Sequence, residues 1–88
     1  MDKKKLLDKA RKNRNSITFK EIQELAVFYG FVFDRQRGTS HKQYKRHDNP
    51  YGFMNFQPRK GDKKMAKPYQ VGQLVNFIAQ LELVKEDE

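Results

Sequence analysis

The stretch Phe31-Val32-Phe33-Asp34-Arg35-Gln36, followed by Arg37-Gly38-Thr39-Ser40-His41 and then Lys42-Gln43-Tyr44-Lys45-Arg46, predicts two antiparallel strands joined by a tight turn. The first run is rich in β-forming residues, and Gly38-Thr39 suits the turn. From Ser40 to His47, period-two alternation makes Tyr44 the core anchor and places His41, Gln43, Lys45 and His47 on the other face. The chain therefore carries a basic hairpin with an imidazole at its mouth.

Elements on either side of this hairpin complete an α-β-β-β-α order. After the turn formers of residues 48–52, a third strand is expected at Phe53 to Gln57. A capping box at Thr18 and Glu21, with Gly30 as the stop, predicts a helix over 18–29. Pro68 and an apolar stripe predict a helix over 68–81, and Pro58 to Lys67 is expected to be a basic loop. Short loops favour an α+β domain: a three-stranded antiparallel sheet with both helices on one face.

The length of 88 residues is that of one domain. We expect residues 1–15 to form a short, loosely docked helical extension, residues 16–84 the domain, and residues 85–88 a charged tail. The absence of cysteine excludes disulfides, thiolate catalysis and cysteine-based zinc sites. The chain has no long apolar run of the kind that predicts a transmembrane helix or a signal peptide. We therefore expect a cytoplasmic location without a membrane partner.

The net charge of +8 is concentrated in one segment. Residues 35–67 contain ten Lys or Arg side chains and two acids, and the rest of the chain is neutral. Clustered cations release counterions when they bind phosphates, so this segment predicts RNA binding. The candidate RNA-binding residues are Arg35, Arg37, Ser40, Lys42, Lys45, Arg46, Lys60, Lys63, Lys64 and Lys67.

His41 is the candidate catalytic residue. RNA is cut without a metal or cofactor when a base takes the proton of a ribose 2′-hydroxyl, that oxygen attacks phosphorus, and an acid protonates the leaving 5′-oxygen. Histidine suits either role near neutral pH, and cations nearby offset the developing charge. The leaving-group acid stays open among Lys42, His47 and water. A metal site at His41, His47 and Asp48 fits no strong spacing motif.

The chain resembles the HicA toxins of bacterial toxin–antitoxin systems. The resemblance covers about residues 16–84. It lies in Gly30-Phe31, Arg35 to His41, Tyr44 to His47, Met54-Asn55-Phe56-Gln57-Pro58 and Ala66-Lys67-Pro68-Tyr69-Gln70-Val71. The usual compact motif is Gly-Ser-His, often with a second His, whereas here Thr39 is inserted and Lys42 follows His41. The resemblance implies a fold like the double-stranded-RNA-binding domain and a metal-independent mRNA interferase with His41 as catalyst. It also implies a HicB-type antitoxin as partner, in a type II system.

Two other functions fit the same residues. A non-catalytic RNA-binding module of the same fold would use the basic hairpin and bind RNA without cutting it. A protein-interaction subunit would use exposed aromatic residues such as Tyr51 and Phe53 to dock an acidic partner, although core packing is the favoured expectation for both. Neither the RNA preference nor the oligomeric state is predicted.

Overall fold

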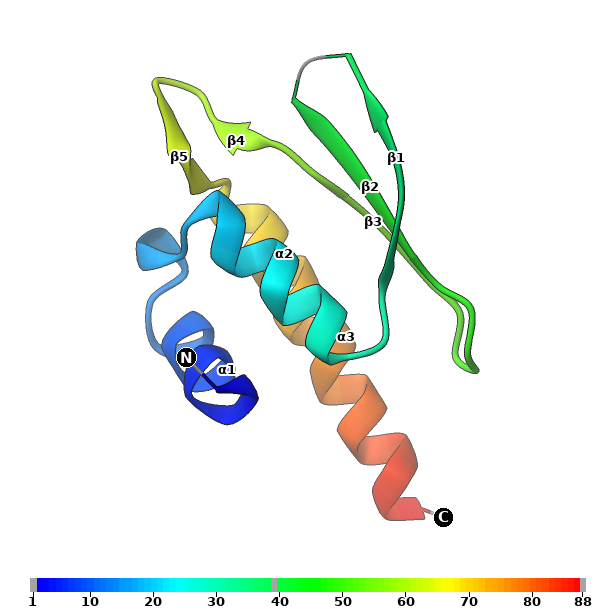
Figure 1. The fold of residues 1–88 in the computed structure, drawn as a ribbon. Coiled ribbons are helices and arrows are strands. Elements are labelled where there is room, and N and C mark those ends of the chain that lie inside the picture. Colours follow the sequence, from blue (N-terminus) through cyan, green and yellow to red (C-terminus); the bar gives the residue numbers. More distant parts are fainter. Residues whose placement is uncertain (1, 39, 88) are drawn as a thin grey trace.

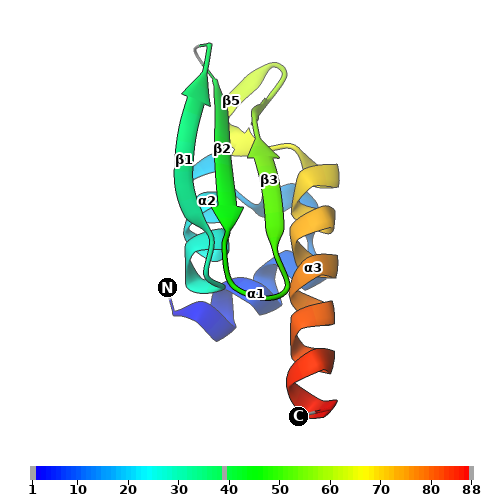
Figure 2. The ribbon, with the colours of Figure 1, turned by 90° about the vertical axis from the view of Figure 1, so that its right-hand side faces the viewer.

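Three antiparallel strands form a meander in the order β1-β2-β3, as the sequence predicts. The computed structural model describes residues 2–38 and 40–87, so Thr39 of the expected turn lies outside the described residues. The helices lie on one side of this sheet (Figure 1), and Figure 2 shows the three strands face-on. The strands are β1 (Val32–Arg37), β2 (His41–Arg46) and β3 (Gly52–Phe56); the helices are α1 (Lys3–Lys12), the 3₁₀ helix η1 (Arg14–Ser16), α2 (Phe19–Phe28) and α3 (Pro68–Asp87).

The start of α2 confirms the predicted capping box. The Thr18 hydroxyl accepts a hydrogen bond from the Glu21 N–H at 3.0 Å, and the Glu21 carboxylate accepts one from the Thr18 N–H at 3.0 Å. Gly30 follows the helix with φ +93°, a left-handed conformation that suits glycine at a helix stop. These two local signals fix both ends of α2 and therefore where the chain enters the sheet.

The strand register assigns each residue to one face of the sheet. Tyr44 lies opposite Phe33 and Met54, and Phe56 lies opposite Lys42. Tyr44 and Phe56 are buried in the core, so this set faces the helices, and Tyr44 is confirmed as the anchor of its strand. The alternate residues face away from the helices because successive side chains of a strand point to opposite faces.

Helix α1 belongs to the core. Leu6, Leu7 and Ala10 are almost completely buried and join the same hydrophobic cluster as α2, the sheet and α3. The expected loose docking of this segment is therefore wrong. Three apolar residues on one face of α1 are enough to dock that face firmly when two other helices pack against it.

The segment 58–67 is a second hairpin rather than a loop. Strands β4 (Pro58–Arg59) and β5 (Asp62–Ala66) pair antiparallel around Gly61, whose φ is +88°. The Ala66 N–H donates to the Ile17 carbonyl at 3.0 Å, which ties the hairpin to the start of α2. This pairing is stabilised by backbone contacts that are distant in sequence, so the lysine-rich composition gave no signal of it. Along the chain this hairpin comes between β3 and α3, and it is an addition to the predicted order of elements.

Two further expectations differ from the structure. Helix α3 continues through Asp87, so residues 85–87 of the expected tail are helical, and Glu88 lies outside the described residues. Tyr51 and Phe53 are 59% and 46% exposed, so the expected core packing of these two aromatic residues is wrong. Phe53 lies opposite Lys45, on the face of the sheet away from the helices.

Candidate nucleic-acid interface

His41 is the first residue of β2 and lies directly opposite Arg37, the last residue of β1. Tyr44 points to the helices, so alternation places His41 on the opposite, solvent-facing side of the sheet. His41 is half-buried and Arg37 is exposed. One imidazole and one guanidinium thus flank the turn at the tip of the hairpin, where both can be approached by a phosphate.

The same face carries one acid that forms ion pairs with two other predicted cations and offsets part of their charge. The Asp34 carboxylate pairs with Arg35 at 3.1 Å and with Lys45 at 3.5 Å. Desolvation acts to raise the pKa of Asp34, but the Arg35 hydrogen bond and the Lys45 charge outweigh it, so the pKa lies below its usual value. Within the described residues Arg37 forms no ion pair, so its charge is the more available one beside His41.

Lys42 lies on the other face of the sheet from His41. Its ammonium is 5.9 Å from the centre of the Phe33 ring, on the side that faces α2. Consecutive strand residues cannot share a face, so the structure separates these two predicted site residues.

Arg46 and Lys67 make internal hydrogen bonds. Arg46 Nε donates to the Tyr29 carbonyl at 2.9 Å, and its Nη1 donates to the Pro50 carbonyl at 2.7 Å. The guanidinium thereby joins the end of α2 to the turn between β2 and β3. Lys67 Nζ donates to Gln57 Oε1 at 2.9 Å. A structural role for these two cations was not predicted, because the Tyr29 and Gln57 partners lie 17 and 10 residues away in the sequence.

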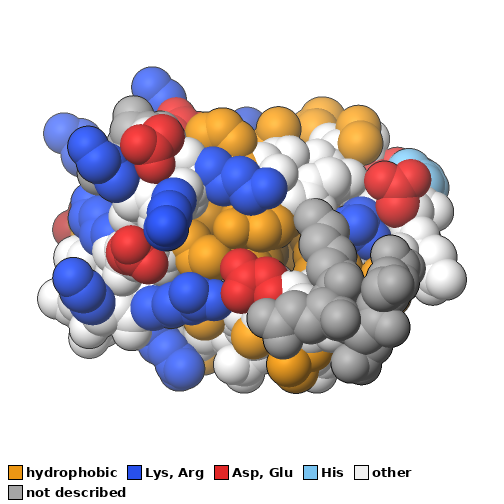
Figure 3. Space-filling view, turned by 90° about the horizontal axis from the view of Figure 1, so that it is seen from below, with side chains coloured by type: hydrophobic (Ala, Val, Ile, Leu, Met, Phe, Trp, Pro, Cys, Tyr) orange, Lys and Arg blue, Asp and Glu red, His pale blue; other side chains and the backbone are white. Residues whose placement is uncertain are grey.

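The β4–β5 hairpin brings a second group of cations to the same end of the molecule. Its Lys60, Lys63 and Lys64 side chains are exposed. In Figures 1 and 2 the tip of this hairpin and the tip of the β1–β2 hairpin, which includes Ser40, project at the same end. At the opposite end, Figure 3 shows acidic side chains interspersed among the basic ones. The end with the two hairpin tips is therefore the best candidate for phosphate contacts.

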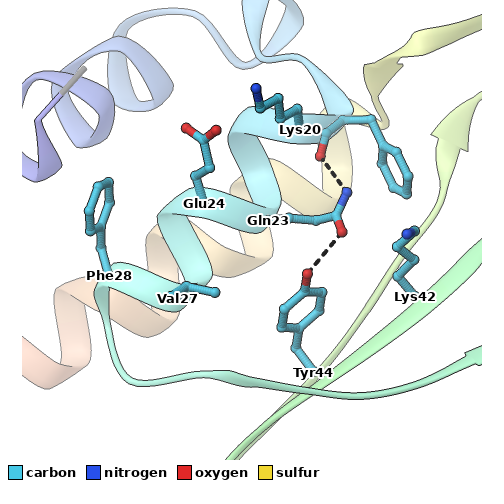
Figure 4. A pocket seen from close by; sticks show the side chains of 8 residues that line it. Lys20, Gln23, Glu24, Val27, Phe28, Lys42 and Tyr44 are labelled. Atoms are coloured by element: carbon cyan, nitrogen blue, oxygen red, sulfur yellow. Dashed lines mark hydrogen bonds between the residues drawn. The ribbon is translucent and has the colours of Figure 1, made fainter.

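A groove between α2 and β2 opens on the helix-facing side of the hairpin (Figure 4). Its floor is fixed by the Tyr44 hydroxyl, which donates to Gln23 Oε1 at 2.8 Å, while Gln23 Nε2 donates to the Phe19 carbonyl at 3.0 Å. Burial raises the pKa of Tyr44 above its usual value, so the phenol stays protonated and remains a donor. The groove was not predicted, although the apolar residues of α2 outside its buried stripe were a signal. It is lined by Phe19, Lys20, Gln23, Glu24, Val27, Phe28, Lys42 and Tyr44.

No group of three or more His, Cys, Asp or Glu side chains within residues 2–38 and 40–87 is arranged to hold a metal ion. His47 follows β2 directly and is exposed, and Asp48 begins the next turn. None of the helices in that part of the chain has the length and apolar character needed to cross a membrane.

Comparisons with known proteins give no match. A scan against protein-family models, a search of curated proteins and a search of solved structures each find no counterpart of this chain. The resemblance to HicA toxins therefore stays a prediction that rests on the motifs quoted above.

Proposed function

We propose that this protein is a metal-independent endoribonuclease that binds mRNA at its two basic hairpins and cuts it with His41. The observation that carries the proposal is the position of His41 directly opposite Arg37 at the turn end of the β1–β2 ladder. An imidazole transfers protons near neutral pH, and a guanidinium binds phosphate oxygens and offsets their developing charge.

The proposed reaction starts with loss of the ribose 2′-hydroxyl proton to a base. The 2′-oxygen then bonds to the adjacent phosphorus, the bond from phosphorus to the 5′-oxygen breaks, and that oxygen takes up a proton. The products are a 2′,3′-cyclic phosphate and a 5′-hydroxyl. In this proposal His41 performs one of the two proton transfers, and the guanidinium of Arg37, which lies opposite His41 in the ladder, offsets the charge that grows on the non-bridging oxygens.

The fold disfavours two of the three candidates for the second proton transfer. Lys42 is on the opposite face of the sheet from His41. His47 lies six residues further along the strand direction, roughly 20 Å away at the usual rise of an extended chain. Water is the remaining candidate for the second transfer.

The biological role that we propose is that of a HicA-type toxin in a type II toxin–antitoxin system, acting in the cytoplasm and neutralised by a HicB-type antitoxin. The order of α2, the three-stranded meander and α3 supports a fold like the double-stranded-RNA-binding domain, with the β4–β5 hairpin as an addition. The quoted sequence motifs support the same assignment.

Expression in bacterial cells tests this role. Induction of the wild-type protein is expected to arrest growth and deplete transcripts, and co-expression of an acidic protein encoded beside it is expected to relieve the arrest. His41→Ala abolishes the arrest, whereas the matched control His47→Ala keeps it. Equal arrest by wild type and His41→Ala contradicts the proposal.

A second candidate function is a non-catalytic RNA-binding module. The exposed cations of the two hairpins favour binding whether or not His41 acts as a catalyst. RNA would then bind in a salt-dependent way and stay intact, and expression would not slow growth. Exposed Tyr51 and Phe53 are also compatible with docking of a partner protein.

A further inference from the structure

The groove between α2 and β2 has the features of a site for an unpaired base. It has a volume of about 460 Å³, within the range of small-molecule sites. Aromatic residues line it from two elements: Phe19 and Phe28 from α2 and Tyr44 from β2. Lys20 and Lys42 also belong to its lining and supply positive charge. Aromatic side chains next to cations are the usual platform for bases of a single strand.

Two residues of the groove lining, Tyr44 and Gln23, are held in place by side-chain contacts. Tyr44 and Gln23 are joined by a hydrogen bond of 2.8 Å, which Figure 4 shows between the helix and the strand. The Phe33 ring contacts the Tyr44 ring edge-to-face with centroids 5.6 Å apart, and Tyr44 contacts Phe56 of the core at the same separation. A ligand that contacts the Tyr44 and Gln23 part of the groove therefore has little entropy of these two side chains to remove, which favours binding there.

The groove and the proposed cleavage site lie on opposite faces of β2, close to the tip of the same hairpin. Lys42 lines the groove, and His41, the preceding residue, lies on the other face of the same strand. An RNA strand that places a phosphate at His41 can pass around the hairpin tip at Gly38 and reach Lys42. Glu24 also lines the groove and repels phosphate, so the Lys42 end of the groove is the favoured end for the RNA backbone.

We infer that the groove between α2 and β2 binds a base of single-stranded RNA, stacked against Phe19, while Lys42 contacts the neighbouring phosphate. This inference rests on the proposed RNA-binding function and adds the substrate class to it. Bases of a duplex are paired and stacked, so they cannot enter the groove. The positive charge of Lys20 and Lys42 favours a polyanion over a neutral apolar peptide as occupant.

The absence of tryptophan from the chain allows a direct test. Phe19→Trp places a single indole in the groove, and its fluorescence is quenched when a base stacks on it. The probe is a short 2′-O-methyl RNA strand, which cannot be cut through its 2′-oxygen. The comparison probes are the duplex of the same sequence and an abasic strand of equal length. Fluorescence anisotropy of labelled probes measures binding independently of stacking.

The expected result is quenching by the single strand and none by the duplex or the abasic strand. Phe19→Leu keeps apolar bulk but removes the ring, so it is expected to lower the affinity for the single strand roughly tenfold. It leaves the affinity for the abasic strand unchanged, and Tyr51→Leu, at an exposed aromatic residue outside the groove, changes neither.

Binding of the single strand by anisotropy, with no quenching and no effect of Phe19→Leu, overturns the inference while RNA binding stands. The groove would then be free for a protein partner. If none of the probes binds, the proposed function fails and the inference fails with it. If Phe19→Trp does not fold by circular dichroism, Phe28→Trp, at another lining residue of the same groove, is the second reporter.

Discussion

His41 lies directly opposite Arg37 in the β1–β2 ladder, on the face of the sheet that points away from the helices. Arg35, nearby on the same strand, is paired with Asp34 at 3.1 Å. Both guanidiniums are therefore near the imidazole, but they differ in how far their charge is already neutralised. This difference makes them a matched pair for testing transition-state stabilisation.

Arg37→Ala is expected to lower the single-turnover rate of RNA cleavage about a hundredfold, because one charged donor to the phosphorane is lost. Arg35→Ala is expected to cost much less, since its charge is shared with Asp34. Rates at saturating enzyme, together with dissociation constants, separate chemistry from binding. An equal effect of both substitutions on the rate is incompatible with a special role for Arg37.

The β4–β5 hairpin is expected to contribute affinity without chemistry. Replacing Lys60, Lys63 and Lys64 by alanine lowers RNA affinity and reduces the slope of log affinity against log salt by about 2, because each lost phosphate contact to a single strand removes about 0.7. The control replaces Lys4, Lys5 and Lys12, which are also exposed but lie on α1. Equal slopes for the two triple variants would place the RNA elsewhere.

Arg46 is expected to act on stability rather than on RNA binding. Arg46→Ala removes hydrogen bonds to the Tyr29 and Pro50 carbonyls and is expected to cost about 1–3 kcal/mol of unfolding free energy. Arg37→Ala is the control, and it changes stability by less than about 0.5 kcal/mol because its side chain is exposed. Urea unfolding of both variants provides the comparison. An unchanged stability of Arg46→Ala would show that the hydrogen bonds from Arg46 to the end of α2 and to the β2–β3 turn are dispensable.

The burial of Leu6 predicts that α1 is needed for the fold. Leu6→Ala is expected to lower the free energy of unfolding by about 2–5 kcal/mol, because Leu6 is completely buried between helices. The matched control is Leu83→Ala, at a leucine of α3 that is 61% exposed. Thermal or urea unfolding that gives the same small loss for both leucines would mean that α1 docks only loosely.

Glu21 is expected to make stability depend on acid pH. Burial acts to raise the pKa of Glu21, but hydrogen bonds from Thr18 and Lys9 and the charge of Lys9 outweigh it, so its pKa is lowered in the folded protein. A lowered folded-state pKa stabilises the protein above the ordinary glutamate pKa and loses that effect as pH falls through the folded-state value.

Unfolding of Glu21→Gln and wild type as a function of pH measures this effect. At pH 7 the variant is expected to be less stable by about 0.5–1 kcal/mol, because the amide can still accept from the Thr18 N–H but loses the ion pair with Lys9. The difference should shrink as the pH is lowered below about 4.3, the ordinary glutamate value. A difference that stays constant from neutral to acid pH contradicts the predicted ionisation.

Local rules explain which parts of the fold were predictable. The ends of α2 depend on contacts three residues apart, and the burial of Tyr44 depends on strand alternation, so both can be read from the sequence. The β4–β5 hairpin depends on a hydrogen bond from the Ala66 N–H to the Ile17 carbonyl, and the structural role of Arg46 depends on its hydrogen bond to the Tyr29 carbonyl. Such contacts are set by the whole fold. The composition of these segments indicated only a basic loop at residues 58–67 and a phosphate contact for Arg46.

The same distinction applies to the candidate site. Charge counting found the cations of both hairpins, but it did not separate the available charge of Arg37 from that of Arg35, which Asp34 neutralises. Alternation could place His41 and Lys42 on opposite faces. The groove that Lys42 lines could be recognised only once α2 was packed against the sheet.

The most direct test of RNA cleavage by His41 is a single-turnover assay of purified protein on RNA in the presence of EDTA. Wild type is expected to cut and leave a 2′,3′-cyclic phosphate, and His41→Ala is expected to be slower by about 10²–10⁴ while keeping its fold and its RNA affinity. Equal cleavage by wild type and His41→Ala, or a product without the cyclic phosphate, would contradict the account.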